Sequence, residues 1–142
     1  MWTSSQPSAG YRGTRNPVRP TPGRMAIGFL VSWVAMLAHN LFELPLTPFD
    51  IENSGPLLVG LALLAAYWRR PTSRAVQVAI LAWALLNLVV GGVVSVLPLP
   101  VLPFDPEQSL SHYLAHLVYT TGQVPLVLLA AAALRRPRPA TL

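Results

Sequence analysis

Three long apolar runs, at residues 25–46, 75–97 and 109–134, limit what this chain can fold into. An α-helix rises 1.5 Å per residue, so about 20 apolar residues cross a membrane core about 30 Å thick. Each of the three runs is long enough for one crossing. Only 11% of the residues are charged, whereas soluble domains contain about 25%. The sequence therefore predicts an all-α integral membrane protein.

A fourth, shorter run at 55–68 determines whether the chain crosses three times or four. It is long enough if its helix begins near Asp50 or Ser54, or if the bilayer thins around it. Tyr67 and Trp68 end it as interfacial aromatic residues do. Four helices are needed for basic and acidic loops to alternate between the two sides of the membrane, and in an up-down bundle the first and fourth helices are neighbours. We therefore expect four transmembrane helices at about 25–46, 52–68, 74–97 and 109–134.

The charged residues divide into two groups along the chain. All ten basic residues are arginines, and they lie in segments 12–24, 69–74 and 135–138. The five acidic residues lie in the other two loops: Glu43, Asp50, Glu52, Asp105 and Glu107. By the positive-inside rule, both termini are expected in the cytoplasm. Because the basic clusters flank apolar runs, we expect no nucleic-acid partner, and the Arg-, Ala-, Gly- and Pro-rich composition favours the inner (cytoplasmic) membrane of a bacterium.

The segments outside the helices are short. Residues 1–24 are rich in Ser, Pro, Gly and Arg, so we expect a disordered cytoplasmic tail. The transmembrane domain then covers 25–136, and 137–142 form a C-terminal cytoplasmic tail. No small-x-small cleavage site follows the first run, which argues against a signal peptide. The chain has no cysteine, which excludes disulfides, thiolate metal sites and a cysteine nucleophile.

Two loops of the chain resemble each other. LPLTPFDIE (44–52) and LPLPVLPFDPE (97–107) each follow a long apolar run and precede a helix that ends in Arg-Arg. This pattern indicates a tandem duplication of a two-helix hairpin. Asp50 and Asp105 are expected to be N-cap residues of the helices that follow, because a carboxylate accepts the free N–H groups of a first turn.

Three histidines and one glutamate form the candidate site. His39 and Glu43 are four residues apart near the outer end of the first helix, and His112 and His116 are four apart near the start of the last. Residues four apart share a face of a helix. Because these two helices are antiparallel, His39 is expected at the depth of His116 and Glu43 at the depth of His112.

Several kinds of chemistry fit this set. Imidazoles and a carboxylate are ligands for Zn or Cu, and His39 with His116 is an alternative axial pair for a b-type haem. Proton or ion handling is a further use. In the default interpretation there is no cofactor: the side chains bond one another and backbone carbonyls, and so join the first and fourth helices.

Polar residues also lie near the middle of the last two helices. Asn87 and Gln123 are at similar depth, so an interhelical hydrogen bond between them is expected, with Thr121 nearby. Pro125 removes one backbone hydrogen bond and is expected to kink the helix, with Gly122 absorbing the kink. Broken helices of this kind build binding sites in transporters.

A small-residue patch lies on the third long run. Gly91, Gly92 and Ser95 leave room for another backbone to approach closely. The neighbour is either another helix of this chain or a second subunit.

The sequence contains no motif of an activated nucleophile, a phosphate-binding loop or a zinc protease, so we expect no enzyme. It predicts a non-catalytic accessory or structural subunit of a membrane assembly, in contact with lipid and with a partner membrane protein or a second copy. One alternative is an outer metal- or haem-binding module built from His39, Glu43, His112 and His116. The other is a small transporter or channel with a kinked fourth helix.

Overall fold

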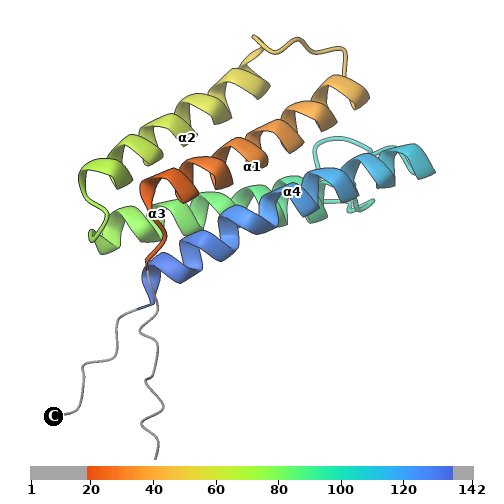
Figure 1. Cartoon of the computed structure of the whole chain (residues 1–142). Coiled ribbons are helices and arrows are strands. Elements are labelled where there is room, and N and C mark those ends of the chain that lie inside the picture. Colours follow the sequence, from red (N-terminus) through yellow and green to blue (C-terminus); the bar gives the residue numbers. More distant parts are fainter. Residues whose placement is uncertain (1–18, 136–142) are drawn as a thin grey trace, which may run out of the picture.

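The protein is all-helical over the part described by its computed structural model, residues 19–135, where no strand occurs (Figure 1). Residues 1–18 and 136–142, which include most of the expected N-terminal tail and all of the C-terminal one, lie outside the described residues. The helices are α1 (Pro22–Glu43), α2 (Ile51–Arg69), α3 (Arg74–Leu85) and α4 (Leu110–Leu134). After α3, the chain continues as a π-helix, η1 (Leu86–Val93), and a 3-10 turn, η2 (Val94–Val96).

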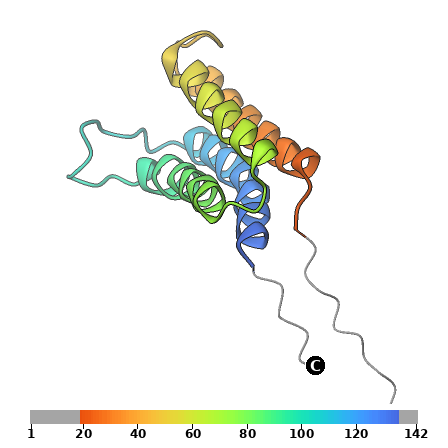
Figure 2. The same cartoon turned by 90° about the vertical axis from the view of Figure 1, so that its left-hand side faces the viewer.

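The four helices lie antiparallel to their neighbours in the order of the chain. Figure 1 shows the α1–α2 and α3–α4 loops at one end and the α2–α3 loop at the other. The most extensive contact is between α1 and α4; α2 packs on α1, and α3 with η1 packs on α4. Figure 2 shows the same arrangement along the helices. The first and last helices are therefore the central pair.

The two ends of this arrangement differ in charge. We name the end with the α2–α3 loop the basic end, because six described arginines flank it: Arg19, Arg24, Arg69, Arg70, Arg74 and Arg135. The opposite end is the acidic end, and its residues are Glu43, Asp50, Glu52, Asp105 and Glu107. The buried apolar core gathers toward the basic end around Met25, Phe29, Tyr67, Ile80 and Leu126.

Three helical segments are long and apolar enough to cross a membrane, by length and composition: Pro22–Glu43, Arg74–Val96 and Leu110–Leu134. The second of these joins α3, η1 and η2 into one segment. α2 does not belong to this group. Large apolar side chains are exposed on the outer faces of these segments, as a lipid environment requires, and examples are Ile27, Leu30, Leu117 and Leu128.

α1 begins earlier and ends earlier than the sequence predicted. The Thr21 hydroxyl accepts a hydrogen bond from the Arg24 N–H at 3.3 Å, and Pro22 occupies the first turn, where its missing N–H costs nothing. The helix therefore starts at Pro22 instead of Met25, and the last residues of the expected disordered tail are helical. It ends at Glu43, because Leu44 is extended before Pro45.

Neither of the two predicted aspartates caps a helix with its carboxylate. Asp50 holds the N-cap position of α2, but its carboxylate accepts the backbone N–H and the hydroxyl of Thr47 within the loop. The Thr47 backbone bond, and then the hydroxyl bond, lower the pKa of the Asp50 carboxyl. Asp105 is not a cap at all, because α4 begins after Ser109, whose hydroxyl accepts the His112 N–H at 3.2 Å.

Glycine allows the close approach of α1 and α4. A Cβ atom on Gly122 would overlap the Cβ atom of Ala35, and a Cβ on Gly28 would lie 2.8 Å from Leu129 Cδ1. Gly122 is therefore required by helix packing, which is a different role from the predicted one of absorbing a kink. α4 continues as one helix through Pro125.

We predict that Gly122→Ala destabilises the protein by about 1–3 kcal/mol, the usual cost of overpacking. The added methyl group has no space against Ala35 of α1. Unfolding in detergent by increasing denaturant measures the change. Gly23→Ala is the matched control, because nothing lies within 4 Å of a Cβ there. Equal stability of the two variants, or no recovery when Ala35→Gly is combined with Gly122→Ala, would contradict the packing argument.

Candidate functional site

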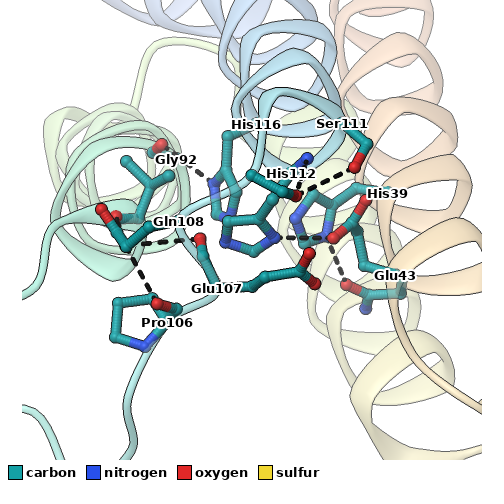
Figure 3. Close-up of polar contacts among 12 residues, drawn as sticks. His39, Glu43, Gly92, Pro106, Glu107, Gln108, Ser111, His112 and His116 are labelled. Carbon is teal, nitrogen blue, oxygen red and sulfur yellow. Dashed lines mark hydrogen bonds and ion pairs between the residues drawn. The ribbon is translucent and has the colours of Figure 1, made fainter.

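The histidine cluster, His39, His112 and His116, lies between α1 and α4 toward the acidic end (Figure 3). The ring centroids of His39 and His116 are 4.3 Å apart, and those of His112 and His116 are 4.6 Å apart, both edge to face. The His39 and His112 centroids are 6.3 Å apart. The structure thus brings all three predicted histidines into one group, with His116 in the middle.

Glu43 joins this group through a hydrogen bond with His112. The Glu43 Oε2 atom lies 2.6 Å from His112 Nδ1, and the two side chains are only 9% and 12% exposed. A carboxylate accepts and the ring nitrogen donates, so Nδ1 of His112 carries a proton. Burial keeps water away from the pair and makes the bond a strong orienting contact for this ring.

His39 is oriented by a relay of two amides that begins at the α1–α2 loop. The Thr47 carbonyl accepts from Asn53 Nδ2 at 2.8 Å, and Asn53 Oδ1 accepts from Asn40 Nδ2 at 2.8 Å. Asn40 Oδ1 is then left to face His39 Nδ1, 3.1 Å away. The Thr47 carbonyl can only accept, so each amide in turn donates toward the loop and presents its oxygen to the next residue. His39 Nδ1 must therefore donate to Asn40 Oδ1.

Asn53 was not among the residues singled out from the sequence, yet it holds this end of α2 on α1. It is completely buried, and its backbone carbonyl also accepts from Trp33 Nε1 at 3.0 Å. Asn53 lies in the first turn of α2. A polar residue at that position gives no signal of its tertiary partners.

His116 is oriented by η1. Its Nδ1 atom lies 3.2 Å from the carbonyl oxygen of Gly92, which can only accept. Gly92 is one residue from the end of η1, where carbonyl groups lose their intrahelical partners. A Cβ on Gly92 would lie 2.6 Å from Thr120 Oγ1, and one on Gly91 would overlap the Tyr119 hydroxyl. The small-residue patch therefore faces α4 of the same chain, and the Ser95 hydroxyl bonds back to the Gly91 carbonyl at 2.6 Å.

All three histidine rings therefore have the same tautomer when neutral, with the proton on Nδ1. Each Nδ1 donates to an oxygen outside the cluster, so each neutral ring has its lone pair on Nε2. His39 Nε2 and His112 Nε2 are buried and have no hydrogen-bond partner among the described residues. Two acceptor nitrogens are thus buried without a bond, which costs free energy unless another group uses them.

A cavity of about 630 Å³ adjoins the cluster. Residues from α1, η1, the α3–α4 loop and α4 line it. Its polar lining includes the three histidines and three carboxylates, which belong to Glu43, Asp105 and Glu107. Its apolar lining includes Met36 and Phe104. The cavity combines cation-binding chemistry with partial shelter from water.

The geometry bears on the metal and haem interpretations in different ways. Among residues 19–135, no three or more His, Cys, Asp or Glu side chains are arranged, as they lie, to hold a metal ion. A haem with His39 and His116 as axial ligands would need its macrocycle between the two rings. Ring centroids 4.3 Å apart are in van der Waals contact and leave no room for one.

The polar residues in the middle of the helices do not form the predicted contact. Gln123 bonds Ser32 of α1 instead: the Ser32 hydroxyl donates to Gln123 Oε1, and Gln123 Nε2 donates to the Ser32 carbonyl at 3.0 Å. Asn87 Nδ2 donates to the Trp83 carbonyl at 2.8 Å. The prediction of an Asn87–Gln123 bond is wrong, because α4 turns Gln123 toward α1.

The remaining members of the predicted transport path also lie apart. Thr121 is exposed on the outer face of α4. Asn87 Oδ1 accepts from the Tyr119 hydroxyl at 3.3 Å. Ser32 was missed from the sequence, although its spacing of four from Gly28 is the small-residue pattern of close helix pairs. Asn87 and Gln123 therefore have separate partners, and Thr121 faces away from both.

Comparison of the chain with family models, with curated proteins and with solved structures gives no match. What the site can do follows from its own side chains.

We predict that Ser32 and Gln123 are energetically coupled and that Asn87 and Gln123 are not. A double-mutant cycle of Ser32→Ala and Gln123→Ala should give about 0.6 kcal/mol and at most about 1.7 kcal/mol, the range of buried interhelical bonds in membranes. Unfolding in detergent measures each variant. The cycle of Asn87→Ala with Gln123→Ala is the matched control and is expected near zero. Coupling in the control but not in the first cycle would contradict the described contacts.

Proposed function

We propose that this chain is a small integral membrane protein that crosses the membrane four times, as an up-down bundle with both termini in the cytoplasm. The distribution of charge over the two ends carries this proposal. Arginines flank the basic end and every described acidic residue lies at the acidic end. The positive-inside rule then assigns the basic end to the cytoplasm and the acidic end to the outside.

α2 is the helix on which four crossings depend. It has 19 residues, which at 1.5 Å per residue extend about 28 Å, close to the hydrocarbon thickness. Leu58 and Leu61 expose 63% and 52% of their surfaces on its outer face, and Trp68 near its end exposes 66%. An apolar outer face with a terminal tryptophan supports a membrane location for α2. The two similar loops at the acidic end support duplication of a two-helix hairpin.

The proposed role is that of a non-catalytic accessory or structural subunit of an assembly in the cytoplasmic membrane of a bacterium. The interior supports this role because most of its buried polar groups bond other helices. Ser32 with Gln123, and Asn40 with Asn53, are examples. Exposed apolar faces on every helix offer surfaces for lipid or for another membrane helix.

We predict that single cysteines report this topology, since the natural chain has none. Phe49→Cys and Val101→Cys, at positions 89% and 80% exposed in the two loops of the acidic end, should react with a membrane-impermeant maleimide in intact cells. Thr72→Cys, in the α2–α3 loop, should react only after permeabilisation. The unsubstituted chain measures the background. Labelling of Phe49→Cys and Thr72→Cys from the same side would show that α2 does not cross.

We predict for the accessory role that the tagged chain, extracted in a mild detergent from the membrane of its own cells, contains a second membrane polypeptide in fixed stoichiometry. Native mass spectrometry measures the composition of the complex. Leu58→Ala and Leu128→Ala, which change exposed positions on α2 and α4, identify the contacting face. A monomer or a complex of identical chains in several detergents would contradict the accessory role and leave the topology untouched.

A further inference from the structure

We propose that His39, His112 and His116 bind one divalent ion of the zinc and copper class through their Nε2 atoms, and that Glu43 orients His112 without binding the ion. This inference goes beyond the accessory role and does not depend on it. The four residues were recognised from sequence as possible ligands together. The structure separates them into three nitrogen donors and one supporting carboxylate.

The tautomer shared by the three rings is the first support. A metal ion binds the nitrogen that has the lone pair, and the opposite nitrogen then carries the proton. The Gly92 carbonyl, the Glu43 carboxylate and the Asn40 amide oxygen each face an Nδ1 atom. In each neutral ring the lone pair is therefore on Nε2, and this nitrogen is available to bind an ion.

The identity of these outer partners is the second support. Histidines that bind metal commonly donate their other N–H to a carboxylate, a backbone carbonyl or water, which fixes the ring and makes it a better donor. Two of the three partners are of these usual kinds, the Glu43 carboxylate and the Gly92 carbonyl, and the third is the amide oxygen of Asn40. Simple hydrogen bonding between the helices would not explain why Nε2 of His39 and of His112 are buried without a partner.

The spacing of the rings is the third support. Three imidazoles around one tetrahedral ion, with bonds of about 2.0–2.1 Å, have ring centroids about 5 Å apart. The observed separations of 4.3, 4.6 and 6.3 Å lie on both sides of that value. As they lie in residues 19–135, the three side chains are not arranged around one ion, so binding requires the rings to rotate until their Nε2 atoms converge. The Nδ1 bonds of 3.1 and 3.2 Å at His39 and His116 are long enough to tolerate such movements.

The charge around the cluster favours a cation. Three neutral imidazoles leave the charge of a dication uncompensated, and the buried Glu43 carboxylate beside His112 supplies one negative charge. Asp105 and Glu107 line the adjoining cavity and attract cations to it. Three histidine ligands leave a fourth position for water or for another ligand.

The test uses the full chain, purified in detergent and stripped with a chelator. Zinc and copper ions are added separately, with stoichiometry from elemental analysis and affinity from competition with a coloured chelator. We expect one ion per chain. His39→Gln, His112→Gln and His116→Gln should each weaken binding by more than the about 10- to 100-fold that loss of an outer partner costs. The amide of glutamine keeps a polar group at each position, which favours folding.

Two further variants test the division of roles. Glu43→Gln should weaken binding by about 10- to 100-fold but retain one ion per chain. Glu107→Gln, which changes a carboxylate of the same cavity, is the matched control and should leave the affinity within a factor of about 3 of the natural chain, because screened long-range attraction is weak. Loss of stoichiometric binding in Glu43→Gln would make Glu43 a ligand and overturn its orienting role.

A fold control separates lost binding from lost structure. Circular dichroism without metal should show the same helix content in the histidine variants and the natural chain, and only the natural chain, Glu43→Gln and Glu107→Gln should gain thermal stability with zinc. The inference is overturned if the natural chain binds neither ion stoichiometrically, or if correctly folded histidine variants bind as it does. Cysteine labelling and native mass spectrometry are unaffected by either result.

Discussion

The contact between α1 and α4 is the interaction on which the rest of the structure depends. It is the most extensive helix pair, and glycines at 28 and 122 bring the two backbones close. In lipid there is little hydrophobic drive to join two helices, so close packing and polar bonds must hold them. The Ser32–Gln123 contact supplies such a bond in the middle of the pair. α2 then packs on α1, and α3 on α4, of a pair that is already specified.

The same contact creates the histidine cluster. Two helices that meet closely and antiparallel bring residues of equal depth together, so His39 lies beside His116 and Glu43 beside His112. The neighbouring elements then determine the direction of each ring. η1 does so for His116 through a carbonyl at its end, and the α1–α2 loop does so for His39 through two asparagines. The cluster is therefore coupled to η1 and to the α1–α2 loop.

Sequence reasoning located the helices and the residues of the cluster because both depend on simple periodicity. Apolar length predicted the long helical segments, and a spacing of four with antiparallel depth paired the same side chains that the structure brings together. Sequence reasoning failed where the rotation of a helix about its axis determines which neighbour a side chain faces. Asn87 and Gln123 have similar depth, but Gln123 faces α1, so depth alone chose the wrong partner. The start of α1 was also missed. The Thr21 hydroxyl caps the helix with one local hydrogen bond, and the apolar run that was used to place the helix begins only at Met25.

The winding of the third long segment shows what periodicity cannot describe. A change from α to π turns at Leu86 rotates every later side chain relative to a regular helix. Asn87 bonds the Trp83 carbonyl at this change, and Gly91 and Gly92 then face α4, with the Gly92 carbonyl aimed at His116. The irregular winding thus positions an outer partner of the cluster, which gives the π-helix a structural reason.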